Sequence, residues 1–315
     1  MAVHRSVLDL IGHTPLVELP ALSPAGSRIL AKLEGQNPGG SIKDRIALAM
    51  VDAAEAEGRL APGQRILEPS SGNTGIGLAM VCRVRGYHLT VVMPENVSPE
   101  RRQLLEVFGA DIIDSPADEG SNGAVRKAER LAKELDDHVM LFQYGNPANP
   151  AAHYATTGPE IYEDCPEVSH VVAGLGTSGT LMGVSRYLRE RNPGVQVWAV
   201  EPPAGELVAG LRSLEEGFVP PIFDPDLLDR KLIIRPRESV AWTRRLASEA
   251  GVFAGISSGS VMAGAARVAA EAAGAGERPV VVAILPDGGW KYLSSGVWTD
   301  DIDEVVERAS RIVYF

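Results

Sequence analysis

A single lysine lies where a helix is expected to begin, within the segment Gln36–Arg45. Ser41 is followed at the third position by Asp44, a spacing that resembles a capping box, so we predict a helix that starts here and continues to Ala56. Lys43 then lies in the first helical turn, where the positive end of the helix dipole favours a neutral amine. A neutral lysine amine can form a Schiff base with a carbonyl compound. The alternative for Lys43 by its position alone is a solvated surface lysine.

Two loops rich in glycine and hydroxyl residues could bind anions. The loop Ser70–Gly75 joins an expected strand to a helix N-terminus, where N–H groups and hydroxyls can bind a carboxylate or phosphate, or only cap the turn. The loop Gly174–Thr180 matches the GxGxxG pattern, and Glu201 lies about 20 residues further on, where a dinucleotide-binding enzyme places an acid. The hydroxyls of this second loop suit a phosphate monoester better than a pyrophosphate. A nicotinamide-dependent dehydrogenase remains the alternative at this point.

A third glycine-rich loop indicates possible hydrolase chemistry, and the histidines are the candidates for a metal site. Gly255–Gly259 matches the GxSxG nucleophile elbow of serine hydrolases. Such a hydrolase needs a histidine later in the chain, but His170 is the last of the 6 histidines. The histidines show no HxH or HExxH spacing, so no metal site is predicted.

Short apolar runs alternate with alanine-rich stretches along the chain. This rhythm predicts an α/β fold with parallel-rich sheets that are covered by helices on both faces. Strands are expected at 89–93, 110–113, 139–142, 170–173, 195–200 and 279–285, and helices at 74–84, 99–108, 122–135, 181–191 and 263–273. In such folds ligands bind at the carboxyl ends of the strands.

Clusters of Gly, Pro and Asn at 35–40 and 145–150 mark the expected domain boundaries. They predict a smaller lobe of residues 36–145 and a larger lobe of residues 1–35 with 146–315. A length of 315 residues is enough for one large domain or two intertwined ones.

Composition excludes several classes of protein. Lys and Arg number 30 against 41 for Asp and Glu, and the net charge of −11 argues against nucleic-acid binding. No run of 18 apolar residues predicts a membrane span, and the N-terminus lacks the apolar region of a secretory signal. Cys82 and Cys165 form no CxxC pair, so we expect the reducing cytoplasm.

Taken together, the motifs resemble the cysteine synthase family of pyridoxal-phosphate enzymes, which have the tryptophan-synthase-β type of fold. The matching segments cover nearly the whole chain, and their order and spacing are more specific than any one of them. They are 11–16, 37–45, 68–75, 144–149, 157–160, 174–180, 255–259 and 286–294. The resemblance implies a two-lobe enzyme of fold type II, a cytoplasmic homodimer that makes L-cysteine from an activated serine. A member that binds partners without catalysis is the other possibility.

The resemblance also implies a role for each site residue. Lys43 would hold pyridoxal 5′-phosphate as a Schiff base and move the α-proton of the amino-acid substrate, and Asn73 would hydrogen-bond the phenolic oxygen of the cofactor. The loop that cradles the cofactor phosphate would be Gly176, Thr177, Ser178, Gly179 and Thr180, with Ser178 where most of the family has Gly. The residues implied to bind the substrate carboxylate are Ser70, Ser71, Thr74 and Gln143.

Ser257 is the residue implied to face the pyridine nitrogen. Many enzymes that use this cofactor place an aspartate there, which protonates the ring and deepens the electron sink. A neutral hydroxyl leaves the nitrogen largely unprotonated, so the carbanion expels a β-substituent quickly. We therefore expect β-replacement through an aminoacrylate instead of transamination.

Further segments resemble the actinobacterial subgroup that uses O-phosphoserine: 93–96, 101–106, 210–220 and 289–294. In that subgroup an arginine at the Arg212 position recognises the substrate phosphate, and a small thiocarboxylated carrier protein supplies the sulfur. A guanidinium can bind a phosphate bidentately, whereas an acetyl ester carries no charge. The alternatives are a solvated Arg212 near Glu215 and Glu216, and an O-acetylserine sulfhydrylase that uses free sulfide. The tail 311–315 would fold over the active site.

Overall fold

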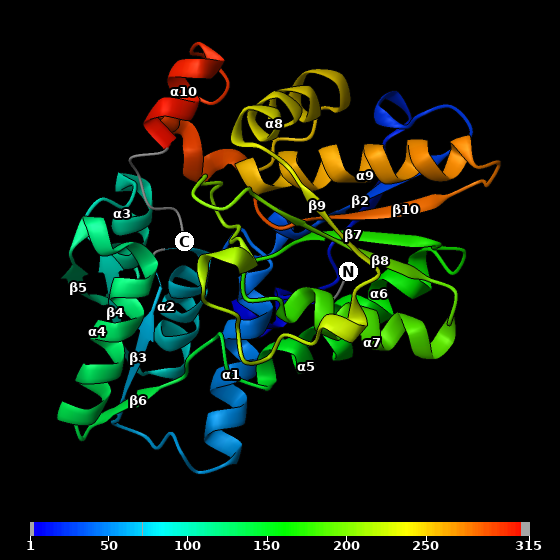
Figure 1. Ribbon diagram of the computed structural model, residues 1–315. Helices are drawn as coiled ribbons and strands as arrows, with labels where there is room; N and C mark the ends of the chain where they lie inside the picture. Colours follow the sequence, from blue (N-terminus) through cyan, green and yellow to red (C-terminus); the bar gives the residue numbers. More distant parts are fainter. Residues whose placement is uncertain (1–2, 71, 310–315) are drawn as a thin grey trace.

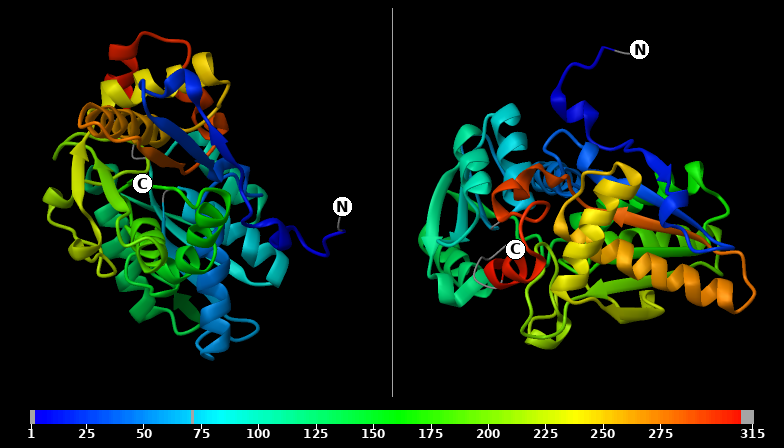
Figure 2. Two further views of the ribbon diagram at one scale, coloured as in Figure 1. Left: turned by 90° about the vertical axis from the view of Figure 1, so that its right-hand side faces the viewer. Right: turned by 90° about the horizontal axis from the view of Figure 1, so that it is seen from above.

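The computed structural model describes residues 3–70 and 72–309. It contains a six-stranded sheet of order β1-β2-β10-β7-β8-β9 and a four-stranded sheet of order β5-β4-β3-β6 (Figure 1). Figure 2 shows the smaller sheet and its helices to one side of the larger unit. Ser71 and the tail 311–315, both of which carry predictions, lie outside the described residues.

The larger sheet is parallel except for its first strand, which runs antiparallel to its neighbour. Its strands are β1 (Leu16–Glu18), β2 (Arg28–Leu33), β7 (His170–Gly174), β8 (Gln196–Glu201), β9 (Arg230–Ile233) and β10 (Val280–Leu285). Alternate residues of β10 enter different cores, because successive strand side chains point to opposite faces. One face is covered by α8 (Pro236–Ala250) and α9 (Ile256–Gly274), and the other by α6 (Thr157–Asp164) and α7 (Gly179–Arg191) (Figure 1).

The smaller sheet is entirely parallel. Its strands are β3 (Arg65–Pro69), β4 (His88–Pro94), β5 (Asp111–Ser115) and β6 (His138–Met140). One face packs against α1 (Lys43–Ala56), α2 (Asn73–Arg85) and α3 (Pro99–Val107), and the other against α4 (Gly120–Glu134). The remaining helices are α5 (Ala148–Ala155), beside α1 and α7, and α10 (Ile302–Ala309), beside α8.

The expected elements are present, with three differences. The side chain of Ser41 accepts from the N–H of Lys43 and not from that of Asp44, so the predicted capping box is wrong. Strand β6 ends at Met140, before Phe142, whose φ of 56° is incompatible with an extended strand. Helix α9 begins at Ile256, inside the Gly/Ser stretch that was predicted as a loop. A Cβ on Gly259 would lie 2.0 Å from the Ser239 carbonyl oxygen, so glycine there permits close packing of α8 on α9.

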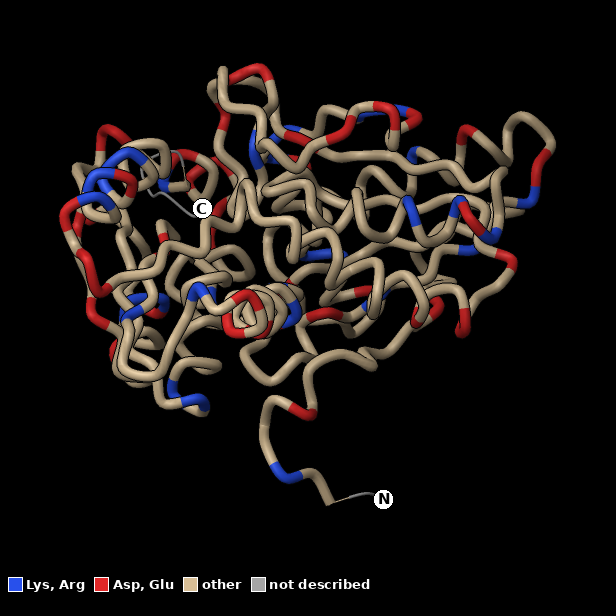
Figure 3. The backbone as a smooth tube through the Cα atoms, turned by 90° about the horizontal axis from the view of Figure 1, so that it is seen from below, with Lys and Arg blue, Asp and Glu red and all other residues tan. Residues whose placement is uncertain are grey.

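Figure 3 shows Lys and Arg positions interspersed with Asp and Glu positions on the side that it presents. None of the helices formed by residues 3–70 and 72–309 is long and apolar enough to cross a membrane.

Candidate active site

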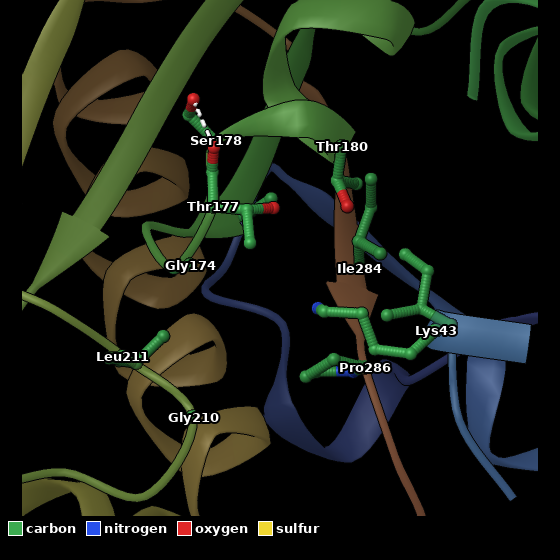
Figure 4. Close-up of a pocket in the computed structure, with 12 residues that line it drawn as sticks. Lys43, Gly174, Thr177, Ser178, Thr180, Gly210, Leu211, Ile284 and Pro286 are labelled. Carbon is green, nitrogen blue, oxygen red and sulfur yellow. Dashed lines mark hydrogen bonds between the residues drawn. The ribbon is translucent and has the colours of Figure 1, made fainter. Parts of the chain in front are cut away.

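Two adjoining pockets open at the carboxyl ends of the strands, and Lys43 lines both of them. The first pocket lies against the Gly174–Thr180 loop and the second against the Ser70–Gly75 loop. Figure 4 shows Lys43 extending from the start of α1 into the first pocket, opposite Gly210 and below Thr177. The structure thus brings together loops from both sheets around one amine.

Lys43 is the first residue of α1 and is only partly exposed. Burial lowers the pKa of its amine; Asp287 and Glu34 oppose this shift, whereas the nearby ammonium of Lys291 adds to it. The sequence predicted a neutral amine from the helix dipole, and the direction of the shift agrees although burial is its main cause. The alternative of a solvated surface lysine is wrong.

A buried ion network holds the start of α1 in place. The Arg45 guanidinium donates to Glu34 at 2.8 and 2.9 Å and to Glu160 at 2.6 and 2.7 Å. The ammonium of Lys32 lies 2.8 Å from Glu160. Burial alone would raise the pKa of Glu160, but the hydrogen bonds from Arg45 and Lys32 lower it to about 2. Because Arg45 is two positions from Lys43, this network fixes the helix turn from which the amine projects.

The Gly174–Thr180 loop forms a cradle in which a side chain would clash at one glycine and fit tightly at another. A Cβ on Gly179 would lie 1.9 Å from Asn149 Oδ1, and a Cβ on Gly176 would lie 3.1 Å from the Gly210 carbonyl oxygen. Ser178 precedes α7 with a φ of 69°, a left-handed conformation that glycine adopts without strain. Its hydroxyl donates to the Thr177 carbonyl at 2.5 Å. Ser178 therefore adopts a backbone conformation that favours glycine, the residue that the family resemblance leads us to expect at this position.

The hydroxyls of this cradle are held from behind by α5. Asn149 Nδ2 donates to Thr177 Oγ1 at 3.0 Å, and His153 Nε2 lies 3.2 Å from Thr180 Oγ1. The N-terminal turn of α7 faces the same pocket. Free helix N–H groups, hydroxyls and glycines in this arrangement fit a phosphate group.

The Ser70–Gly75 loop is built around hydroxyl and amide groups. Ser70 Oγ accepts from the backbone N–H of Gly75 at 3.0 Å. Thr74 Oγ1 donates to Gln143 Oε1 at 2.6 Å, and the backbone N–H of Gln143 donates to Glu68 at 3.0 Å. Ser70, Thr74 and Gln143 all line the second pocket, so three of the four residues predicted for a carboxylate lie together.

Ser257 and Asn73 occupy the first turns of two helices that meet at the second pocket. A Cβ on Gly210 would lie 3.5 Å from Ser257 Oγ. The amide of Asn73 lies between Lys291 and Asp287, which sequence reasoning placed in a matching segment without giving them a role. No spacing or composition signal distinguishes these two residues, because their significance arises from contacts across the fold.

Arg212 lines the second pocket and is buried, with 5% of its surface exposed. Its Nη1 donates to Asn122 Oδ1 at 3.0 Å. Its guanidinium carbon lies 5.3 Å from the ring centre of Tyr144 and 4.8 Å from that of Phe218. The alternative of a solvated arginine is wrong. Asn122, on α4, was missed because nothing in its local sequence marks it.

Among the residues that the structure describes, the side chains considered for dehydrogenase and hydrolase chemistry have other surroundings. Glu201, the candidate ribose-binding acid, is fully buried and accepts from the Leu214 N–H and from Lys231. No histidine lies among the residues that line the second pocket with Ser257. Within the described part of the chain, no group of three or more His, Cys, Asp and Glu residues could hold a metal ion.

Comparisons with known proteins identify what the chain is similar to. The sequence model of the family described as pyridoxal-phosphate dependent enzyme matches residues 7–287. Cysteine synthase B from Pseudomonas aeruginosa is 42% identical over 297 residues, which cover 94% of this chain and 98% of that protein. A crystal structure of the cysteine synthase OASS from Entamoeba histolytica superposes with a TM-score of 0.89 at 33% identity, covering 97% of this chain and 96% of that one. The structure of an O-ureido-L-serine synthase superposes with a TM-score of 0.88 at 40% identity, covering 94% and 96%.

Proposed function

The chain belongs to the family of pyridoxal-phosphate dependent enzymes, and it is a cysteine synthase with the type II fold, a transferase of the EC 2.5.1 class. From this premise we propose that it makes L-cysteine from O-phospho-L-serine. Its cofactor is pyridoxal 5′-phosphate. The observation that carries the choice of substrate is the buried guanidinium of Arg212 in the same pocket as Lys43.

The residues of the two pockets fit the cofactor. When bound, pyridoxal phosphate supplies an electrophilic carbonyl and an electron sink for the carbanion that forms at the substrate α-carbon. Lys43 is the attachment residue in our proposal, because its amine projects into the pocket and burial favours its neutral form. The same amine then removes the substrate α-proton, which is the role that a lysine of lowered pKa can perform.

The loop at 176–180 holds the cofactor phosphate in our proposal. Two features support this assignment. Gly179 has no side chain, where a Cβ would clash with Asn149, so the cradle stays open. Asn149 also donates a hydrogen bond to Thr177 and so orients its hydroxyl. Ser257 faces the pyridine nitrogen as a neutral partner, which favours β-replacement over transamination.

Ser70, Ser71, Thr74 and Gln143 bind the substrate carboxylate in this proposal. The short hydrogen bond between Thr74 and Gln143 holds the loop and the segment after β6 together, so a carboxylate can contact both at once. The N-terminus of α2 adds N–H groups that favour an anion.

Arg212 recognises the phosphate of O-phosphoserine. The rings of Tyr144 and Phe218 restrict its guanidinium, and Asn122 binds one of its nitrogens through a neutral amide. Burial strengthens the attraction of such a cation for a phosphate dianion, because less water screens it. An acetyl ester offers no charge to compensate the same guanidinium.

The Arg212–Asn122 hydrogen bond also joins a loop after β8 to α4 of the smaller sheet. We propose that residues 36–145 move as the smaller lobe and close over the substrate, excluding water from the reacting atoms. The sulfur comes from a thiocarboxylated carrier protein or from sulfide, and the enzyme acts as a cytoplasmic homodimer.

Steady-state kinetics test the substrate directly. The enzyme loaded with cofactor is supplied with sulfide and either O-phosphoserine or O-acetylserine, and L-cysteine is measured. We expect a kcat/KM at least about ten-fold higher for O-phosphoserine, which corresponds to one charge-assisted hydrogen bond. A preference for O-acetylserine would show an O-acetylserine sulfhydrylase instead.

A further inference from the structure

A second lysine lies buried beside the active site with every ammonium proton engaged. Lys291 is 6% exposed. Its Nζ donates to the carbonyl oxygens of Gly39 and Gly40 at 3.0 and 3.2 Å, and to Asn73 Oδ1 at 2.8 Å. An ammonium group has three donors, so these three acceptors match its full complement. Lys291 therefore joins the loop before α1 to the first residue of α2.

The amide of Asn73 is held at its other end by a carboxylate. Asn73 Nδ2 donates to Asp287 Oδ2 at 2.9 Å, and Tyr292 donates its hydroxyl to the same oxygen at 2.7 Å. Asp287 is 2% exposed. The carbonyl end of the amide thus meets a cation and its NH₂ end meets an anion.

This pair of charges decides which way the amide faces. Turning the Asn73 amide by 180° would place its NH₂ group against the ammonium of Lys291 and its oxygen against the carboxylate of Asp287. Both contacts would be repulsive at hydrogen-bond distance in a site where little water screens them. The charges of Lys291 and Asp287 therefore fix which end of the Asn73 amide faces each of them.

The fixed orientation leaves a donor for the pocket. An NH₂ group carries two protons, and Asp287 accepts one of them. Asn73 lines the pocket that it shares with Lys43. We propose that Lys291, together with Asp287, is a positioning residue that orients the Asn73 amide so that its second N–H donates to the phenolic oxygen of the cofactor. This inference rests on the contact of Asn73 with that oxygen, which the family resemblance implies and which we include in the proposed function.

The contacts of Lys291, and not its pKa shift, indicate a protonated amine. Three acceptors surround one nitrogen, and a neutral amine would direct its lone pair at one of them. Burial lowers the pKa of the ammonium and the Arg101 guanidinium adds to this shift, whereas the carboxylates of Asp287 and Asp44 oppose it.

A double-mutant cycle on the cofactor-loaded enzyme tests the proposal. Lys291→Met, Asn73→Ala and the double variant are compared by the dissociation constant of pyridoxal phosphate, measured by equilibrium dialysis, and by the visible absorbance maximum of the bound cofactor. We expect each single variant to weaken binding about 5-fold to 10-fold, with the same direction of absorbance shift. The double variant should lie within about two-fold of Asn73→Ala, since Lys291 acts through that amide. The proposal would be overturned if the two single effects on the dissociation constant multiply in the double variant, or if Lys291→Met changes neither the dissociation constant nor the absorbance maximum.

Two further variants separate positioning from stability. Lys133→Met removes a lysine from the exposed face of α4 and should leave cofactor affinity and absorbance unchanged. If the Lys291→Met variant is unfolded at the temperature of the dialysis experiment, Asp287→Asn tests the other end of the Asn73 amide. It should reproduce the absorbance shift of Asn73→Ala, and an unshifted spectrum would overturn the proposal. These measurements use no substrate, so a wrong assignment of O-phosphoserine would not affect their outcome.

Discussion

Replacing Arg212 by alanine should separate recognition of the substrate phosphate from the rest of catalysis. The guanidinium lies in the pocket that Lys43 lines, and the substitution removes it while leaving the cofactor loop at 176–180 intact. We expect the variant to lose activity with O-phosphoserine and to keep it with O-acetylserine.

The size of the loss follows from the contacts that change. A hydrogen bond between charged groups contributes about 1.5–3 kcal/mol. To bind a phosphate with both sides of its fork, Arg212 gives up its bond to the neutral amide of Asn122, which costs about 1 kcal/mol. A bidentate contact therefore leaves a net gain of about 2 kcal/mol or more, so kcat/KM with O-phosphoserine should fall about 30-fold to 100-fold. With O-acetylserine the change should stay within about three-fold, since no charge is lost.

The assay is cysteine formation from each substrate at saturating sulfide, with two companion variants. Arg212→Lys keeps the charge but not the planar fork and should recover only part of the activity with O-phosphoserine. Asn122→Ala removes the competing partner, so the KM for O-phosphoserine should stay the same or fall. Equal losses of Arg212→Ala with both substrates would refute the reasoning and give Arg212 a role in the shape of the pocket.

Three other predictions concern the cofactor and the fold. Ser257→Asp should protonate the pyridine nitrogen and slow β-replacement, and unchanged turnover of the cofactor-loaded variant would refute that argument. Gly179→Ala places a Cβ where 1.9 Å separates it from Asn149 Oδ1, so the cofactor dissociation constant should rise at least about ten-fold in a dialysis experiment. The pKa of Glu160 is lowered to about 2, so its ion pairs stabilise the fold above the ordinary carboxyl pKa of 4.5, and this stabilisation is lost as the pH falls toward 2. Denaturant unfolding near pH 6 should therefore show Glu160→Gln to be about 2 kcal/mol less stable than the unchanged protein, after a discount for solvent screening. Near pH 3 this difference in stability should be smaller. A difference that stays the same at both pH values would contradict the assignment.

The sequence predicted the elements well wherever an apolar run had sharp boundaries. Strand β10 is an example, because Pro279 precedes it and Pro286 follows it. Prediction failed where small residues serve packing. The Gly/Ser stretch before Ala263 was predicted as a loop, but it forms the start of α9 because small residues let that helix pack closely on α8.

Site residues could be predicted only where they belong to a local sequence motif. The loops at 70–75 and 174–180 carry recognisable glycine and hydroxyl patterns, and the structure brings most of their described residues to the pockets that Lys43 lines. Lys291 and Asn122 carry no such pattern. They lie 218 and 90 positions from the side chains that they hold, and only the folded chain brings each pair together.

The cause of the Lys43 pKa shift illustrates the same limit. Local reasoning provides a helix dipole, whereas the larger effect is burial between two sheets, which depends on the whole fold. The direction of the pKa shift could be predicted from the sequence because both effects favour the neutral amine.

The attachment of the cofactor is tested most directly by borohydride reduction of the yellow enzyme, followed by peptide mapping. Lys43 and Lys291 both lie close to the active site, and the structure distinguishes them: Lys43 lines both pockets, whereas Lys291 donates to three acceptors. The account predicts a single pyridoxyl group on the peptide that contains Lys43. A label on Lys291, or active enzyme with no labelled lysine, would contradict it.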